Sequence, residues 1–197
     1  PVAGRFAIVG SIVAIAAVIA TISERARTAA AFVGILGTGG LLAIYGQAYQ
    51  TGADPWELFA VWAALSLLWA LPTRNDAVWC LFVIVAETAL GLWVSTFLQA
   101  PARVEDPAHL ARVAGLTMTG WVLAALIAAP MAPALGLEKR IGRTYWAFRL
   151  AVVLAIALVV TTALTLFFQR NGYAWPDLAA FAVLIGALIV IAITDGF

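Results

Sequence analysis

The chain has 197 residues, of which 64% are hydrophobic and 11% are charged, and its mean hydropathy is +1.03. Soluble domains are about 45–50% apolar and about 25% charged, so this composition excludes a soluble fold and predicts an integral membrane protein. The formal net charge of +1 gives no basis for nucleic-acid binding. One cysteine and one histidine are too few for a disulfide, a zinc site or a haem, so we expect no metal and no cofactor.

Apolar runs between charged residues predict an all-α bundle of about seven transmembrane helices, because a helix needs about 20 apolar residues to cross the hydrocarbon. In chain order the runs are Phe6–Ile22, Thr28–Tyr45, Leu58–Pro72, Ala77–Leu98, Val113–Ala129, Leu150–Phe168 and Leu178–Thr194. The third should start earlier, at Pro55, because Asp54 offers an N-cap acid and Pro55 suits the first helical position. The links are short, so we expect one transmembrane domain over residues 1–197, with no soluble catalytic domain and no enzymatic activity.

Basic residues predict the orientation, since short cytoplasmic loops have an excess of Lys and Arg. One side of the predicted bundle has Arg25, Arg27, Arg74, Lys139, Arg140, Arg143 and Arg149, and the other has Arg5, Arg103, Arg112 and Arg170. We expect the first side to be cytoplasmic, in a bacterial inner membrane, so that the chain starts outside and ends inside. The chain begins at Pro1 without methionine, and an outside start fits a fragment that lacks an upstream segment.

Glu87 is the one acidic or basic residue placed near the predicted bilayer centre. A charged group there costs roughly 2.5–3.5 kcal/mol on insertion scales, which makes it a candidate functional residue. Glu87, Gly91 and Ser95 recur every four residues, with Thr88 beside them, and this polar stripe should point into the bundle. Glu87 is interpreted either as a proton relay or cavity group, or as a protonated carboxyl that joins helices by hydrogen bonds.

The predicted second helix is rich in glycine at positions 34, 37, 39 and 40. That spacing favours close helix packing, and the alternative is a helix that breaks at Gly39-Gly40 to line a cavity. The helix ends at Gln47 and Tyr49, whose amide and phenol groups either bind a ligand or anchor the membrane interface. Trp62 in the third helix is interpreted as a packing residue or as part of an aromatic recognition site.

A basic cluster with neighbouring aromatic residues precedes the sixth predicted helix. Its members are Lys139, Arg140, Arg143 and Arg149. Such a cluster is typical of a topology signal with an interface anchor, and the alternative is a binding site for anionic lipid or a partner protein, because juxtamembrane cations attract acidic head groups.

The segment from about Gly34 to Pro72 resembles a family of predicted bacterial membrane proteins that is defined only as a domain of unknown function. The resemblance rests on Gly46-Gln47-Ala48-Tyr49, then Asp54, Leu58-Phe59, Trp62-Ala63 and Leu71-Pro72, and covers roughly a fifth of the chain. It implies a multi-spanning inner-membrane protein and no particular reaction. If the recurring residues of the family are functional, they correspond here to Gln47, Tyr49 and Trp62.

Two classes of function follow from these residues. The first is a transporter-like or small-ligand or lipid-binding protein, with a cavity built from Glu87, Gln47, Tyr49, Thr88 and Ser95. The second is a non-catalytic accessory subunit of a larger membrane complex, which binds partner helices through small-residue or tryptophan faces. We therefore expect membrane lipids, and either a membrane protein partner or a second copy of the chain, as partners.

Overall fold

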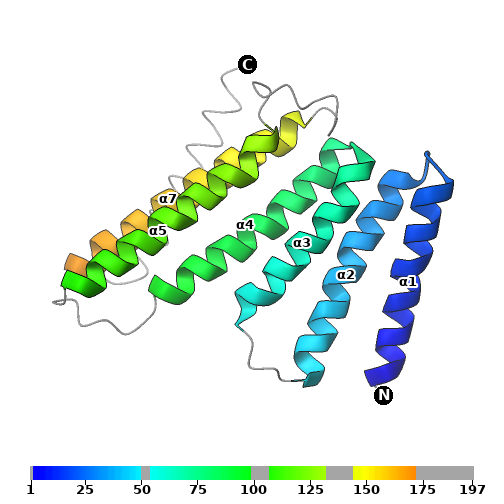
Figure 1. The fold of residues 1–197 in the computed structure, drawn as a ribbon, viewed down its shortest axis with the longest axis horizontal. Helices are drawn as coiled ribbons and strands as arrows, with labels where there is room; N and C mark the ends of the chain where they lie inside the picture. The colour runs from blue at the N-terminus through cyan, green and yellow to red at the C-terminus, as the bar shows by residue number, and fades with distance from the viewer. Residues whose placement is uncertain (1, 50–53, 99–106, 132–143, 172–197) are drawn as a thin grey trace.

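The structure of the protein is a computed structural model that describes residues 2–49, 54–98, 107–131 and 144–171 (Figure 1). All regular structure in these ranges is helical. The helices are α1 (Val2–Ile22), α2 (Arg27–Tyr49), α3 (Pro55–Thr73), α4 (Asp76–Leu98), α5 (Pro107–Ala128) with the 3-10 turn η1 (Ala129–Met131), and α7 (Tyr145–Asn171). The predicted all-helical class is confirmed, and α3 begins at Pro55 as its capping pattern indicates.

Five of the described helices, α1 to α4 and α7, are long and apolar enough to cross a membrane. In α5 the described apolar stretch is the shorter Met118–Ala128. The predicted seventh span, Leu178–Thr194, lies outside the described residues. The number of spans that the described structure supports is therefore five.

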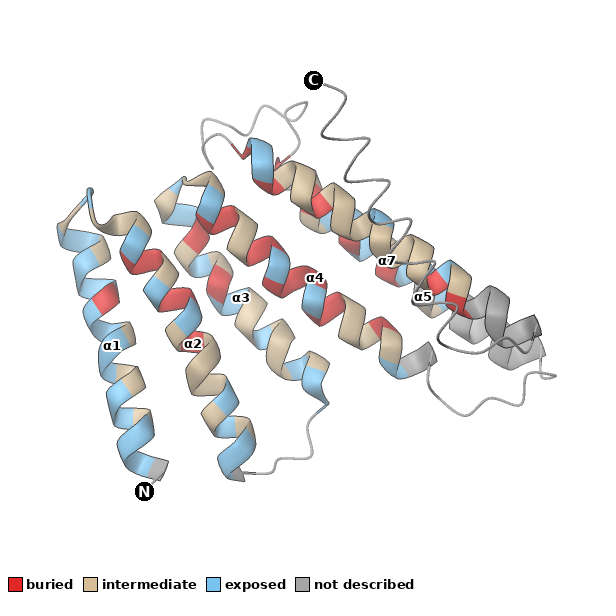
Figure 2. Ribbon diagram, turned by 180° about the vertical axis from the view of Figure 1, so that it is seen from behind, coloured by how far each residue is buried: buried red, intermediate tan, exposed pale blue. Residues whose placement is uncertain are grey.

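Consecutive helices lie side by side, from α1 at one edge through α2 and α3 to α4, which contacts both α5 and α7 (Figure 1). Helix α4 is the centre of the described bundle, because 50% of its apolar stretch is buried, against 6% in α1 (Figure 2). The outward faces are apolar too, with Ile8, Leu68 and Leu126 among the exposed side chains. Helices that are hydrophobic on every side suit a lipid solvent.

The glycines of α2 serve helix packing. The Trp69 ring of α3 lies against Gly34, the Trp62 ring lies against Gly39, and Val13 of α1 lies against Gly37. Glycine at these points lets bulky side chains from both neighbouring helices approach the α2 backbone. Because α2 is continuous from Arg27 to Tyr49, the alternative of a break at Gly39-Gly40 is wrong.

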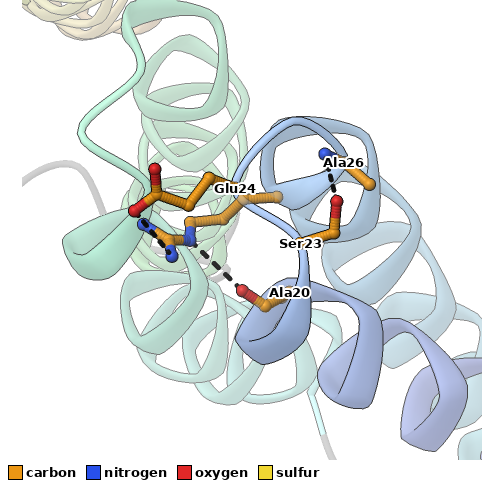
Figure 3. Close-up of polar contacts among 5 residues, drawn as sticks. Ala20, Ser23, Glu24 and Ala26 are labelled. Atoms are coloured by element: carbon orange, nitrogen blue, oxygen red, sulfur yellow. Dashed lines mark hydrogen bonds and ion pairs between the residues drawn. The ribbon is translucent and has the colours of Figure 1, made fainter.

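A short turn joins α1 to α2, and three polar contacts hold it (Figure 3). The Ala26 backbone N–H donates to Ser23 Oγ at 3.3 Å, and Arg27 Nε donates to the Ala20 carbonyl at 3.2 Å. The Arg27 guanidinium also lies 3.8 Å from the Glu24 carboxylate. This turn, the α3–α4 turn and the start of α7 lie at the same end of the bundle, so Arg25, Arg27, Arg74 and Arg149 gather there as predicted (Figure 1).

Candidate functional site

An apolar groove lies between α3, α4 and α5, with a volume of about 650 Å³. Three tryptophans line it, Trp56 from α3 and Trp79 and Trp93 from α4. The other lining residues are alanine, leucine, isoleucine and phenylalanine, so the described walls contain no charged side chain. The exposed Leu71 and Leu126 on its walls show that the groove opens on the outer surface of the bundle.

The groove follows most of the length of α3. Its lining runs from Trp56 to Leu71, which is about 22 Å at a helical rise of about 1.5 Å per residue. Since α3 and α4 are antiparallel, Trp93 lies toward the Trp56 end and Trp79 toward the Leu71 end. The hydrocarbon of a bilayer is about 30 Å thick, so the groove extends over much of that depth.

Alanines create the space in the groove. Ala60, Ala63 and Ala64 on α3 and Ala86 and Ala89 on α4 are among its lining residues. Residues three and four apart share one face of a helix, so each set forms a strip of small side chains between larger ones. Sequence reasoning missed this groove, although alanines at helical spacing in two consecutive apolar helices were a signal that could have found it.

Glu87 is buried in the middle of α4, with 7% of its surface exposed. Neither carboxyl oxygen has a hydrogen-bond partner among the described residues. Glu87 does not line the groove. It shares a face of α4 with Val94, which lies against Gly120 of α5, so this face points away from the α3 side of the groove.

The other members of the predicted polar stripe are less buried than Glu87, and Gly91 and Ser95 are half-buried. Thr88 is exposed, and its hydroxyl donates to the Ile84 carbonyl at 2.6 Å. The half-buried Ser95 donates to the Leu92 carbonyl at 2.8 Å. The prediction of one inward polar face is wrong for Thr88, because a residue next to Glu87 is rotated by about 100° around the helix.

The residues implied by the family resemblance lie apart from Glu87. Gln47 is exposed in the last turn of α2, and Tyr49 is the final residue of that helix, with a side chain outside the described part. Trp62 is half-buried on α3, where its indole N–H donates to the Ile35 carbonyl at 2.9 Å. Neither Gln47 nor Trp62 lines the groove, so the predicted set does not form one cavity in the described structure.

Of the predicted basic cluster, the structure describes only Arg149, because Lys139, Arg140 and Arg143 lie outside the described residues. The Arg149 guanidinium lies 4.0 Å from the centroid of the Tyr145 ring and 5.6 Å from that of Trp146. These are cation–π distances. The aromatic neighbours thus fix the position of the cation at the start of α7.

Asp76 caps the start of α7, and the sequence analysis did not identify this residue. Its two carboxylate oxygens accept hydrogen bonds from the backbone N–H groups of Trp146 and Ala147, each at 2.8 Å. The first N–H groups of a helix have no partner within the helix, so a carboxylate from α4 caps α7 from outside it. The partners are 70 and 71 residues apart, and no local sequence pattern reveals such a pair.

Comparison with known proteins gives one match. A family model described as "Predicted membrane protein (DUF2157)" matches residues 1–79. No curated protein and no solved structure matches the chain. The matched range includes α1, α2, α3 and the first residues of α4, so most of α4 and all of α5, which form two walls of the groove, lie beyond it. The match and the apolar helices support a membrane protein of unknown function.

Proposed function

We propose that this protein binds the acyl chain of a membrane lipid in the groove between α3, α4 and α5. The observation that supports this proposal is the groove itself, with its apolar walls and its volume of about 650 Å³. Ligand pockets typically have about 300–1,000 Å³. An acyl chain is long and thin, and a groove of about 22 Å that opens on the outer face of the bundle offers a matching shape.

The wall chemistry favours an apolar ligand over a polar solute. A polar group placed against alanine, leucine and tryptophan rings would lose its hydrogen bonds to water without replacement. The walls offer no nucleophile and no general base among the described residues, so the proposed role is binding and not catalysis. The proposal does not use Glu87, because that carboxyl lies on another face of α4.

The accessory-subunit alternative stays a prediction. That hypothesis needs small-residue or tryptophan faces that are available to partner helices. Gly34, Gly37 and Gly39 instead contact side chains of α1 and α3 within the chain. These glycines are therefore occupied within the chain, whereas the apolar groove is open to a lipid.

The test uses a phospholipid with a photoreactive group in its acyl chain, incorporated with the protein into nanodiscs. We expect cross-links on the groove walls of α3, α4 and α5. Ala64→Phe should fill the groove and reduce cross-linking severalfold, since Ala64 lines the groove and is exposed enough to accept a larger side chain. Ala43→Phe, at an exposed position of α2 outside the groove, is the matched control.

Cross-links spread evenly over all lipid-facing helices would show that the groove holds lipid no better than the rest of the surface. Cross-linking that Ala64→Phe leaves unchanged would show the same.

A further inference from the structure

The two ends of the groove have opposite charges. At one end, Trp56 is flanked by the exposed carboxylates of Asp54 and Glu57. At the other end, the exposed Arg74 follows the lining residue Leu71 by about one helical turn. The half-buried Asp76 precedes the lining residue Trp79 at this same end, but its carboxylate oxygens accept hydrogen bonds from two backbone N–H groups of α7. We call these the acidic end and the basic end of the groove. A ligand with one charged terminus will therefore prefer one orientation.

We propose that the groove selects an anionic phospholipid, with an acyl chain along α3 and its phosphate at Arg74. This inference rests on the proposed function, because it needs an acyl chain in the groove. The guanidinium of Arg74 attracts the phosphate, and arginine is suited to phosphate because it presents several N–H donors in a planar fork. Asp54 and Glu57 repel the same phosphate from the acidic end.

Arg74 is available for a ligand. It is the C-cap of α3 and adopts the left-handed conformation, with φ of 49°, so the chain turns there and the helix ends. It makes no ion pair with any described residue. The nearest carboxylate in the sequence, Asp76, is engaged by two backbone N–H groups of α7 and so is directed to another partner.

The other described cations at this end differ from Arg74. Arg149 lies over the Tyr145 ring, and Arg27 is paired with Glu24. Arg25 is exposed in the α1–α2 turn, beyond α2 and α3 from the groove (Figure 1). Together they make this end of the bundle attractive to acidic head groups in general. Among the described cations, Arg74 is the one nearest in sequence to a lining residue of the groove, so we expect it to set the head-group preference of the bound lipid.

The experiment compares lipid head groups directly. The protein is placed in nanodiscs that contain equal amounts of phosphatidylglycerol and phosphatidylcholine with identical acyl chains. It is then released gently, and the retained lipids are measured by mass spectrometry. We expect phosphatidylglycerol to be enriched about 1.4- to fivefold among the retained lipids, the range that one exposed ion pair supplies.

Arg74→Asn should remove this enrichment while leaving the total amount of retained lipid nearly unchanged. Asparagine is chosen because it removes the charge and tolerates the left-handed conformation. Arg25→Asn is the matched control, since it removes one cation from the same end of the bundle away from the groove, and it should retain the enrichment.

Orientation is tested with two phosphatidylglycerol probes. A photoreactive group near the glycerol should label residues around Leu71, and one at the acyl terminus should label residues around Trp56. The reverse pattern, or an enrichment that survives Arg74→Asn, would overturn the inference. If Ala64→Phe reduces retained lipid but the wild type shows no head-group preference, the proposed function stands and this inference fails. If Ala64→Phe leaves retained lipid unchanged, the proposed function itself fails.

Discussion

The contact between Gly34 of α2 and the Trp69 ring of α3 gives the sharpest test of the packing. A Cβ added at Gly34 would lie 2.5 Å from two ring atoms of Trp69 and 2.6 Å from a third. Atoms cannot approach this closely, so in Gly34→Ala either the ring must rotate or the two helices must separate. Overpacking of this kind costs about 1–3 kcal/mol.

Gly40→Ala provides the matched control on the same helix. A Cβ there would meet only Val9 Cγ1, at 3.7 Å, which is an ordinary van der Waals contact. Replacing glycine by alanine inside a helix gains up to about 1 kcal/mol of helix propensity, and this gain is the same at both positions. The propensity therefore cancels, and we expect Gly34→Ala to be less stable than Gly40→Ala by about 1–3 kcal/mol.

The free energy of unfolding is measured by titration with sodium dodecyl sulfate in mixed micelles, followed by circular dichroism. Trp69→Leu removes the ring atoms that meet the added Cβ, so Gly34→Ala should cost less in that background than in the wild type. Because the two residues are in contact, a double-mutant cycle isolates this coupling. Equal stability of the Gly34→Ala and Gly40→Ala variants, or a cost that Trp69→Leu does not relieve, would refute the packing argument.

Two further predictions concern carboxyl groups of α4. Asp76→Ala removes both acceptors that cap the start of α7. The amide hydrogens of Trp146 and Ala147 should then exchange with solvent faster, and the protein should lose about 0.5–2 kcal/mol of stability. Unchanged hydrogen exchange would show that the cap is dispensable. Glu87→Leu should leave stability unchanged or raise it, because a buried polar group without a partner is unfavourable, and neither Glu87 oxygen has one among the described residues. A marked loss of stability of Glu87→Leu in a thermal unfolding assay would contradict this expectation and would mean that the carboxyl has a hydrogen-bond partner.

Local signals predicted the six described α-helices, and they placed the starts of α2, α3 and α4 within one residue. The composition alone indicates a lipid solvent. Asp54-Pro55 indicates the start of α3, because Asp is favoured at the N-cap and proline at the first helical position, where its missing N–H is not needed. The predicted starts of α1 and α5 fall four and six residues too late. The sixth helix is predicted to begin at Leu150, whereas α7 begins at Tyr145. That first turn is stabilised by Asp76 from α4, which the sequence near Tyr145 does not reveal.

The candidate site was much harder to predict. Glu87 was identified as a buried carboxyl from its place in an apolar run, and its burial is confirmed. Its supposed neighbours Thr88 and Gln47 are exposed, and the groove was not foreseen. A single charged residue in an apolar run is visible in the sequence. A groove between helices depends on how several helices are placed relative to one another, and no single position in the sequence indicates it.

The sequence by itself determined that the chain is helical, that it belongs in a membrane, and where α2, α3 and α4 begin. Each of these depends on composition and on local backbone chemistry. Only the tertiary structure decided which helix faces meet, that Trp62 and Trp69 pack on glycines of α2, and that alanines of α3 and α4 leave a groove. In a soluble protein the apolar stripe of a helix points to the core, but in lipid the outward and inward faces are equally apolar, so the hydrophobic pattern does not tell them apart.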